Sequence, residues 1–239
     1  MGKTNEFCAL DGNNAPKWSV FNAAAWKLTP NWPWAHLDGG QGQLFGYKIA
    51  WVTYNKSRIL AAAPANRIPA DLLGCVILNE VGGDPPWVKH NIVLPYRQYV
   101  PHLMNWLPGV KPPLQTSEGA VKIQLQAALS ALGQERTDLS RDQQNQLTAC
   151  LETDSFNIEV VARLLRQLIL FDYPKIDTRS LTDEQFIIAG SRYNRGTARP
   201  LQDFVQSLRD PPGKPTREYT SYGRAMLRHR TEVRAILGM

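Results

Sequence analysis

Seven prolines lie within residues 84–117 of this 239-residue chain, and they restrict what that stretch can form. Proline lacks a backbone N–H, and its ring clashes with the preceding turn of a helix. A long helix is therefore excluded here, and we expect an extended, shaped loop region. The segments on both sides of the prolines carry helical patterns, so the sequence predicts a mainly α protein with irregular Pro-rich loops.

The segment before the prolines predicts a helix from about Pro69 to Glu80. Pro69 suits the first helical position, and Asp71 lies in the first turn, where the helix dipole favours an anion. Leu73, Ile77 and Glu80 follow one another at spacings of four and three, so they share one face of the helix. The helix is expected to stop at the two glycines that follow.

The segments after the prolines predict several further helices. The clearest covers about residues 156–171, where Ile158, Val161, Leu165 and Leu168 form one apolar stripe. Asp154 or Ser155 can cap this helix. The other predicted helices cover residues 120–132 with Gly133 as the stop, the run after a Thr182–Gln185 capping box, a segment opened by Pro200, and about residues 221–237. A polar connector is predicted over residues 134–146.

The N-terminal part of the chain has a weaker pattern. Residues 1–65 are rich in Trp, Gly and Asn, and are predicted to be an arm packed on a main domain of residues 66–239. The apolar run from Leu44 to Tyr54 fits a strand or a helix, since short apolar runs do not distinguish the two.

The formal net charge of +6 bears on possible partners. The last segment, residues 214–239, holds six basic residues against two acidic ones, which gives it a charge of +4. A basic surface suits a polyanion such as nucleic acid, an acidic cell wall or a membrane face. A solvated helix face is the plainer alternative.

Other compositional features bear on location and cofactors. Apolar runs stay far below the roughly 20 residues that a membrane-spanning helix needs, and the N-terminus lacks the apolar core of a secretory signal. We therefore expect a chain made in the cytoplasm without a signal peptide. Its three cysteines are too few and too scattered to predict a disulfide scaffold or a CxxC metal site, and Cys75 fits a small core residue. The four histidines are dispersed, so no metal and no cofactor is expected.

Glu80 is the strongest candidate for chemistry. It continues an apolar stripe and lies at the negative end of its helix, and both effects predict a raised pKa for its carboxyl group. A carboxylic acid protonated near neutral pH can donate a proton to the leaving oxygen of a glycoside. The following glycines would let a polymer approach closely. A glutamate facing solvent at a helix end is the structural alternative.

Four segments occur in an order known from one superfamily. They are Ile77–Gly83 with a Glu at the helix end, Gly119–Gln124 ending in Gln, Asn157–Leu165 beginning with Asn-Ile, and Ala189–Gly196 with a Tyr-Asn-x-Gly element. In these segments the chain resembles the lysozyme-like soluble lytic transglycosylases and goose-type lysozymes over roughly residues 67–235. It departs from them in the long gap between Glu80 and Gln124, and in Lys122, where the family tends to have Gly.

The resemblance implies a lysozyme-like helical catalytic domain that cleaves the glycan strand of peptidoglycan. The bond would be the β-1,4 link between N-acetylmuramic acid and N-acetylglucosamine. By the same resemblance Glu80 is the general acid, Gln124 lines the cleft, and Tyr193 with Asn194 contacts the sugar or the acid. Core packing is the alternative role for Tyr193.

The reaction has two possible outcomes. A hydrolase with two catalytic carboxylates needs a second one across the scissile bond, and Asp84 and Glu118 are the candidates. Asp84 could equally be a turn residue, and Glu118 a helix cap. A lytic transglycosylase uses the single Glu and leaves 1,6-anhydro ends. The sequence slightly favours a muramidase because Glu118 is present.

Two further readings stay open: a non-catalytic cationic module that binds glycan or nucleic acid, and a chitinase. For the enzyme, no nucleic acid partner is expected. A basic wall-degrading chain without a signal peptide resembles antibacterial effectors delivered to the periplasm by a specialised machine such as type VI secretion, or phage-type endolysins. A delivered effector implies an immunity protein in the producing cell.

Overall fold

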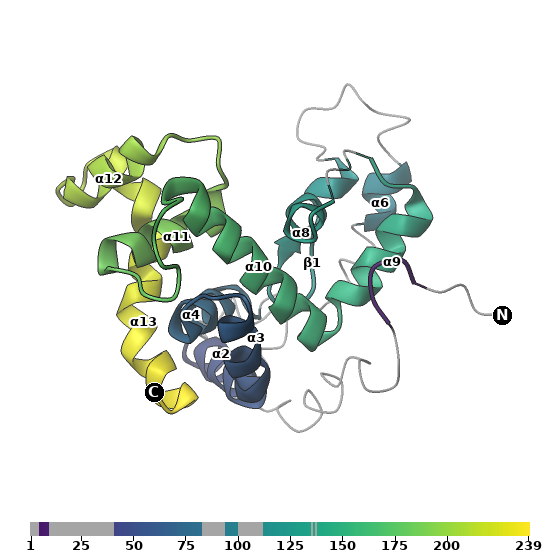
Figure 1. Ribbon diagram of the computed structural model, residues 1–239, viewed down its shortest axis with the longest axis horizontal. Helices are drawn as coiled ribbons and strands as arrows, with labels where there is room; N and C mark the ends of the chain where they lie inside the picture. The colour runs from purple at the N-terminus through teal and green to yellow at the C-terminus, as the bar shows by residue number, and fades with distance from the viewer. Residues whose placement is uncertain (1–4, 10–40, 83–93, 100–111, 135, 137) are drawn as a thin grey trace. The chain divides into compact units, whose positions relative to one another are not determined.

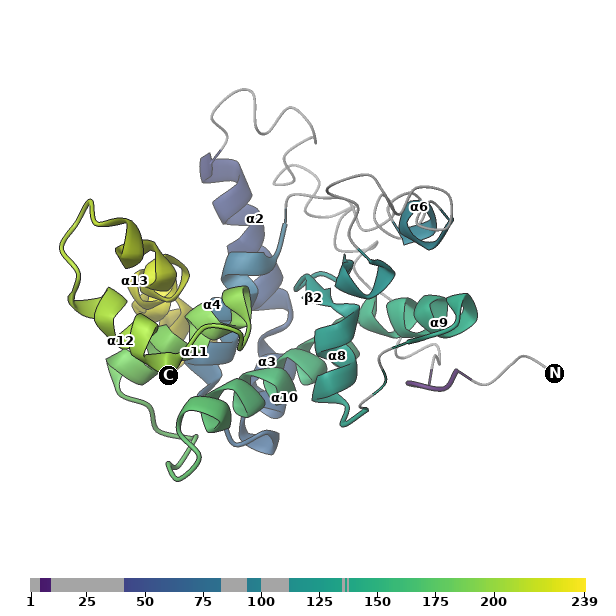
Figure 2. The ribbon, with the colours of Figure 1, turned by 90° about the horizontal axis from the view of Figure 1, so that it is seen from above.

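The structure, a computed structural model, describes residues 5–9, 41–82, 94–99, 112–134, 136 and 138–239, and this part of the chain is mainly helical (Figures 1 and 2). It divides into two compact units, each made of two stretches of sequence. Unit 1 comprises residues 1–51 and 80–160, and unit 2 comprises residues 52–79 and 161–239. No helix in the described ranges is long and apolar enough to cross a bilayer.

Unit 2 contains the C-terminal helices together with the middle of the N-terminal half. Its elements are α3 (Lys56–Ala65), most of α4 (Ala70–Glu80), the second half of α10 (Asp154–Asp172), α11 (Asp183–Arg195), α12 (Leu201–Arg209), the 3-10 helix η4 (Pro215–Thr220) and α13 (Ser221–Leu237). α11 and α13 lie side by side in both views (Figures 1 and 2). A Cβ added at Gly223 would lie 1.9 Å from the carbonyl oxygen of Ile187, so this contact requires glycine.

A buried carboxylate joins α4 to α13 within unit 2. The Asp71 side chain is only 2% exposed, and its Oδ2 atom is 2.8 Å from Arg230 Nε and 3.2 Å from a terminal nitrogen of Arg234. Arg230 also pairs with Asp183 at the start of α11 and lies over the ring of Phe186. A carboxylate without such partners would be costly to bury, so these pairs fix the packing of α4 on α13.

Unit 1 contains the residues around the Pro-rich stretch. Its elements are the first part of α2 (Gln41–Tyr54), α6 (Leu94–Tyr99), the 3-10 helix η3 (Pro113–Gln115), β1 (Ser117–Glu118), β2 (Ile123–Gln124), α8 (Leu125–Ala131), α9 (Arg141–Leu151) and the first part of α10. The two strands form a small antiparallel hairpin in which Ser117 is opposite Gln124 and Glu118 is opposite Ile123.

The hairpin corrects the prediction of a helix over residues 120–132. The helix begins five residues later, at Leu125, because the chain reverses between the strands. Gly119 and Lys122 both have positive φ, at 74° and 51°, which no helix accommodates. The predicted stop at Gly133 is confirmed by its φ of 71°.

Helix α9 corrects the predicted polar connector over residues 134–146. Its start is a capping box, in which the Gln143 N–H donates to Ser140 Oγ and the Ser140 N–H donates to Gln143 Oε1. The helix buries a narrow stripe that includes Leu147 and Leu151, and the rest of its surface is polar. Because the segment is mostly polar, it has too few apolar residues to show a helical period in the sequence.

A disulfide that was not predicted joins Cys8 to Cys150 near the end of α9. Asn5 donates a hydrogen bond to the Gln146 carbonyl, and Glu6 pairs with Arg136, so residues 5–8 are held against α9 and the segment before it. The third cysteine, Cys75, is fully buried in α4, as predicted for a small core residue.

The other helix predictions are largely confirmed. The run after Leu44 is helical, and all four residues of the apolar stripe of α10 are buried. The capping box of Thr182 with Gln185 opens α11, α12 follows Pro200, and α13 covers Ser221–Leu237. The cap prediction for α10 is wrong in its boundary, because Asp154 and Ser155 already lie in the helix. Of the predicted arm, residues 1–4 and 10–40 lie outside the described residues.

Candidate functional site

Glu80 is the last residue of α4, and its surroundings change there from core to surface. Residues 71–78 are all buried, including Leu73 and Ile77 of the predicted stripe, whereas Asn79 and Glu80 are half-buried. Val81 is buried again, and Gly82 has a φ of 94°, which ends the helix. The Glu80 carboxylate therefore lies at the negative end of a buried helix, with partial access to solvent.

Two lysines belong to the same electrostatic environment as Glu80. Lys48 of α2 is half-buried, and burial lowers the pKa of its ammonium group to about 8, with repulsion from Lys122 as a further cause. The charge of Glu80 acts in the opposite direction on the Lys48 pKa. An amine with a pKa near 8 is divided between its charged and neutral forms slightly above neutral pH. Lys48 thus lies within electrostatic reach of both the Glu80 carboxylate and the Lys122 amine.

Sequence reasoning did not identify Lys48. A lysine inside the apolar run Leu44–Tyr54 was the available signal, because a lysine is rarely buried without an electrostatic role or a long exposed stem. The partners of Lys48 come from residues 80 and 122, which no local pattern connects to α2.

Glu118 and Gln124 lie on the hairpin. Glu118 is 1% exposed, so its side chain lies inside unit 1, whereas Gln124 is exposed at the end of β2. The turn between the strands is anchored by Asn157 of α10, whose Oδ1 accepts a 2.8 Å hydrogen bond from the Val121 N–H. A Cβ at Gly119 would lie 2.7 Å from the Asn157 amide nitrogen, so the turn packs directly on that residue. This turn determines where Lys122 is placed.

Asn157 therefore has a clear structural role in the second and third of the four family-like segments. It is fully buried and ties residues 119–121 to the first turns of α10. Glu80, Gln124 and Asn157 all belong to unit 1, although residues 77–79 and 161–165 of their segments belong to unit 2.

Tyr193 and Asn194 belong to unit 2, in the last turn of α11. Tyr193 is half-buried and Asn194 is exposed. Between α10 and α11, the fully buried Arg192 forms a 2.7 Å ion pair with Asp172, and its guanidinium lies 4.4 Å from the centre of the Phe204 ring. Arg192 fixes the end of α11, and it is a structural residue that the sequence analysis did not single out.

Asp84 lies outside the described residues. In the part of the chain that the structure describes, no group of three or more His, Cys, Asp or Glu side chains is arranged to hold a metal ion.

The described part of unit 1 therefore offers acid–base chemistry. Glu80 can donate or accept a proton, and the ammonium group of Lys48 can stabilise the carboxylate after it has given up its proton. Comparisons of the chain with protein-family models, with curated proteins and with solved structures gave no match.

Proposed function

We propose that this protein cleaves the glycan strand of peptidoglycan and that Glu80 is its general acid. The observation that carries the proposal is the position of Glu80, half-buried at the negative end of a buried helix. The order of the four family-like segments supports the choice of substrate. The proposed bond is the β-1,4 link between N-acetylmuramic acid and N-acetylglucosamine.

In the proposed reaction, the Glu80 carboxylic acid donates its proton to the glycosidic oxygen as the bond between that oxygen and C1 of N-acetylmuramic acid breaks. The carboxylate that remains is stabilised by the positive charge of Lys48 nearby. Lys48 is thus a proposed positioning residue that acts through Glu80. C1 then bonds to the oxygen of a water or of the same sugar's 6-hydroxyl group. In the single-carboxylate reaction the proton lost by that oxygen returns to Glu80. Gln124 is exposed at the hairpin end and is available to contact a sugar.

The burial of Glu118 bears on whether the cleaved glycan ends by hydrolysis or by lytic transglycosylation. An inverting hydrolase needs a second carboxylate that can activate a water, and a retaining one needs a carboxylate that can reach the sugar. Glu118 is 1% exposed inside the hairpin, so it is poorly suited to either task. The reason for preferring a muramidase is thereby weakened, and the alternative that this burial favours is a lytic transglycosylase, which needs only Glu80.

The disulfide supports a place of action outside the reducing cytoplasm. Cys8 and Cys150 are joined, and disulfides persist in oxidising compartments such as the bacterial periplasm. We infer that the protein acts on the cell wall there, as an antibacterial effector that a specialised machine delivers. An immunity protein in the producing cell is then the expected partner.

The proposal is tested by clearing of purified sacculi with the wild-type protein and with Glu80→Gln. Removal of a general acid is expected to lower the rate by about 100-fold or more. Glu184→Gln is the matched control, because it makes the same chemical change at an exposed position of α11. Equal clearing by the wild-type and Glu80→Gln proteins, both folded by circular dichroism, would remove Glu80 from its role.

A further inference from the structure

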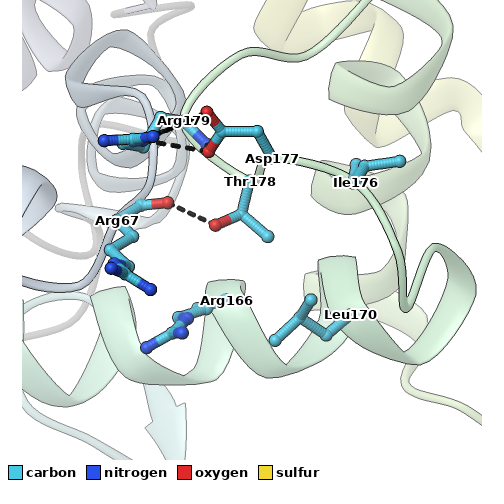
Figure 3. Close-up of a pocket in the computed structure, with 7 residues that line it drawn as sticks. All are labelled: Arg67, Arg166, Leu170, Ile176, Asp177, Thr178 and Arg179. Carbon is cyan, nitrogen blue, oxygen red and sulfur yellow. Dashed lines mark hydrogen bonds and ion pairs between the residues drawn. The ribbon is translucent and has the colours of Figure 1, made fainter.

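Unit 2 contains a pocket of about 230 Å³ with an unusually basic lining (Figure 3). Its walls come from three places in the sequence: Arg67 between α3 and α4, Arg166 and Leu170 on α10, and residues 176–179 in the loop before α11. Leu170 and Ile176 supply its apolar surface. Because three separate segments surround it, the pocket exists only in the folded unit.

The charges around the pocket do not cancel. Three arginines, Arg67, Arg166 and Arg179, and one aspartate, Asp177, line the pocket, which gives the lining a formal charge of +2. Arg179 donates hydrogen bonds of 2.9–3.2 Å to the Asp177 carboxylate from its Nε atom and from one terminal guanidinium nitrogen (Figure 3). These bonds, together with the charge of Arg67, lower the pKa of Asp177, so its carboxylate is charged at neutral pH and the excess of +2 persists.

Arg166 contains a donor that needs a partner. Its Nε atom is buried and has no hydrogen-bond partner among the described residues. Burying a donor without an acceptor costs free energy, and most buried polar groups in native proteins have a partner. Arg166 also lines the pocket, so an acceptor placed there lies beside its guanidinium group.

Arg67 adds a second unusual feature at the same place. Its φ is 56°, a left-handed backbone conformation that is unfavourable for arginine. The conformation is held by two hydrogen bonds, from the Arg67 N–H to the Pro64 carbonyl and from the Thr178 hydroxyl to the Arg67 carbonyl (Figure 3). Backbone strain of this kind persists where the surrounding structure fixes it, often at binding sites. Thr178 thus ties the Arg67 wall of the pocket to the Asp177–Arg179 wall.

We propose that this pocket binds a doubly charged tetrahedral oxyanion, namely the phosphate group of a small phosphomonoester. The charge of −2 matches the excess of +2, and guanidinium groups arriving from three segments suit oxygens that point in several directions. The volume accommodates a phosphate with a small organic group and is below that of a typical drug-sized site. This inference does not depend on wall cleavage, and its residues are separate from Glu80.

The test is a calorimetric titration of the full-length protein with inorganic phosphate and with glycerol 3-phosphate, at pH 7.5 and constant ionic strength. Acetate is the singly charged planar comparison. We expect saturable binding of both phosphates, and acetate binding at least tenfold weaker. Loss of one charged hydrogen-bond donor should weaken phosphate binding by about tenfold or more.

Two variants remove the donors without breaking the fold. Arg166→Met keeps the aliphatic stem in α10, and Arg67→Asn keeps a residue that tolerates positive φ. Arg228→Met is the matched control, because it removes one positive charge from an exposed position of α13 that does not line the pocket. Melting curves check that all three variants are folded.

The results divide clearly. Weakened phosphate binding in Arg166→Met and Arg67→Asn, with wild-type binding in Arg228→Met, would support the proposal. Non-saturable binding, equal binding of acetate, or equal weakening in all three variants would overturn it, since each indicates a general response to charge. Binding of inorganic phosphate without binding of glycerol 3-phosphate would refute the assignment to a phosphomonoester.

Discussion

The half-buried Lys48 predicts an unusual dependence of stability on pH. Its pKa is about 8 in the folded protein, against an ordinary value of 10.5. Folding therefore favours the neutral amine, and the charged form destabilises the folded state at lower pH. The shift corresponds to an upper limit of ~3 kcal/mol, which solvent screening of the partly exposed ammonium reduces to about 1–2 kcal/mol.

The sign of this pH dependence follows from the number of protons that the folded and unfolded states bind. Between pH 8 and pH 10.5 the unfolded chain keeps the Lys48 proton and the folded chain has lost it, so stability rises with pH across this window. Below pH 8 both states are protonated and the full penalty applies. Lys48→Met removes the penalty, so we expect the variant to be more stable than the wild type by about 1–2 kcal/mol at pH 7. This advantage should disappear by about pH 10.5.

The assay is urea unfolding followed by circular dichroism at pH 7, 8, 9, 10 and 10.5 for both proteins. Burial raises the pKa of Tyr173 to about 12, which lowers stability above pH 10, but this effect is common to both proteins and cancels in their difference. Lys175→Met, at an exposed position, controls for the loss of one positive charge. If the difference in free energy of unfolding between wild type and Lys48→Met stays constant from pH 7 to pH 10.5, then folding does not lower the pKa of Lys48.

Three further substitutions test the packing. Gly223→Ala should destabilise unit 2 by about 3 kcal/mol or more in urea unfolding, because its Cβ would lie 1.9 Å from the Ile187 carbonyl oxygen, and unchanged stability would contradict that close approach. Asp71→Asn should lower the free energy of unfolding by about 2 kcal/mol in the same assay, a value between those of exposed and fully buried ion pairs. A loss below ~0.5 kcal/mol would mean that the ion pairs of Asp71 with Arg230 and Arg234 do not stabilise the fold. Cys8→Ser should lower the free energy of unfolding by about 2–4 kcal/mol, because it removes the disulfide to Cys150, and reduction of the wild type should cause the same loss. Unchanged stability in both cases would show that the disulfide does not form.

Sequence patterns located the helices whose signals are local. The stripe of α10, the capping box of Thr182 with Gln185 and the proline before α12 each lie within a few residues of the element they define. Such signals act through the 3.6-residue period and through the unsatisfied N–H groups at helix starts. They could therefore be read without knowledge of the rest of the fold.

The errors came from features that depend on distant residues. The segment around Ile123 has a helical composition, but the turn before it packs on Asn157, and that contact favours a hairpin. The disulfide joins residues separated by 142 positions, a distance over which spacing carries no information. Tertiary contacts of this kind override local propensity.

The candidate site was predictable in part. The helix end at Glu80 followed from the glycines and the apolar stripe, and the structure places it there. Lys48 could not be assigned to the same environment, because its electrostatic partners at residues 80 and 122 come from α4 and the hairpin turn. The burial of Glu118 was equally hidden, because it depends on the pairing of β1 with β2.

The proposed cleavage of peptidoglycan by Glu80 is tested by mass spectrometry of the soluble fragments released from purified sacculi. We expect disaccharide-peptide fragments from the wild-type protein and their near absence with Glu80→Gln. Anhydro ends would identify the single-carboxylate reaction that the burial of Glu118 favours, and reducing ends would identify hydrolysis. Intact sacculi after incubation with folded, disulfide-bonded wild-type protein would contradict the proposal that this protein cleaves peptidoglycan.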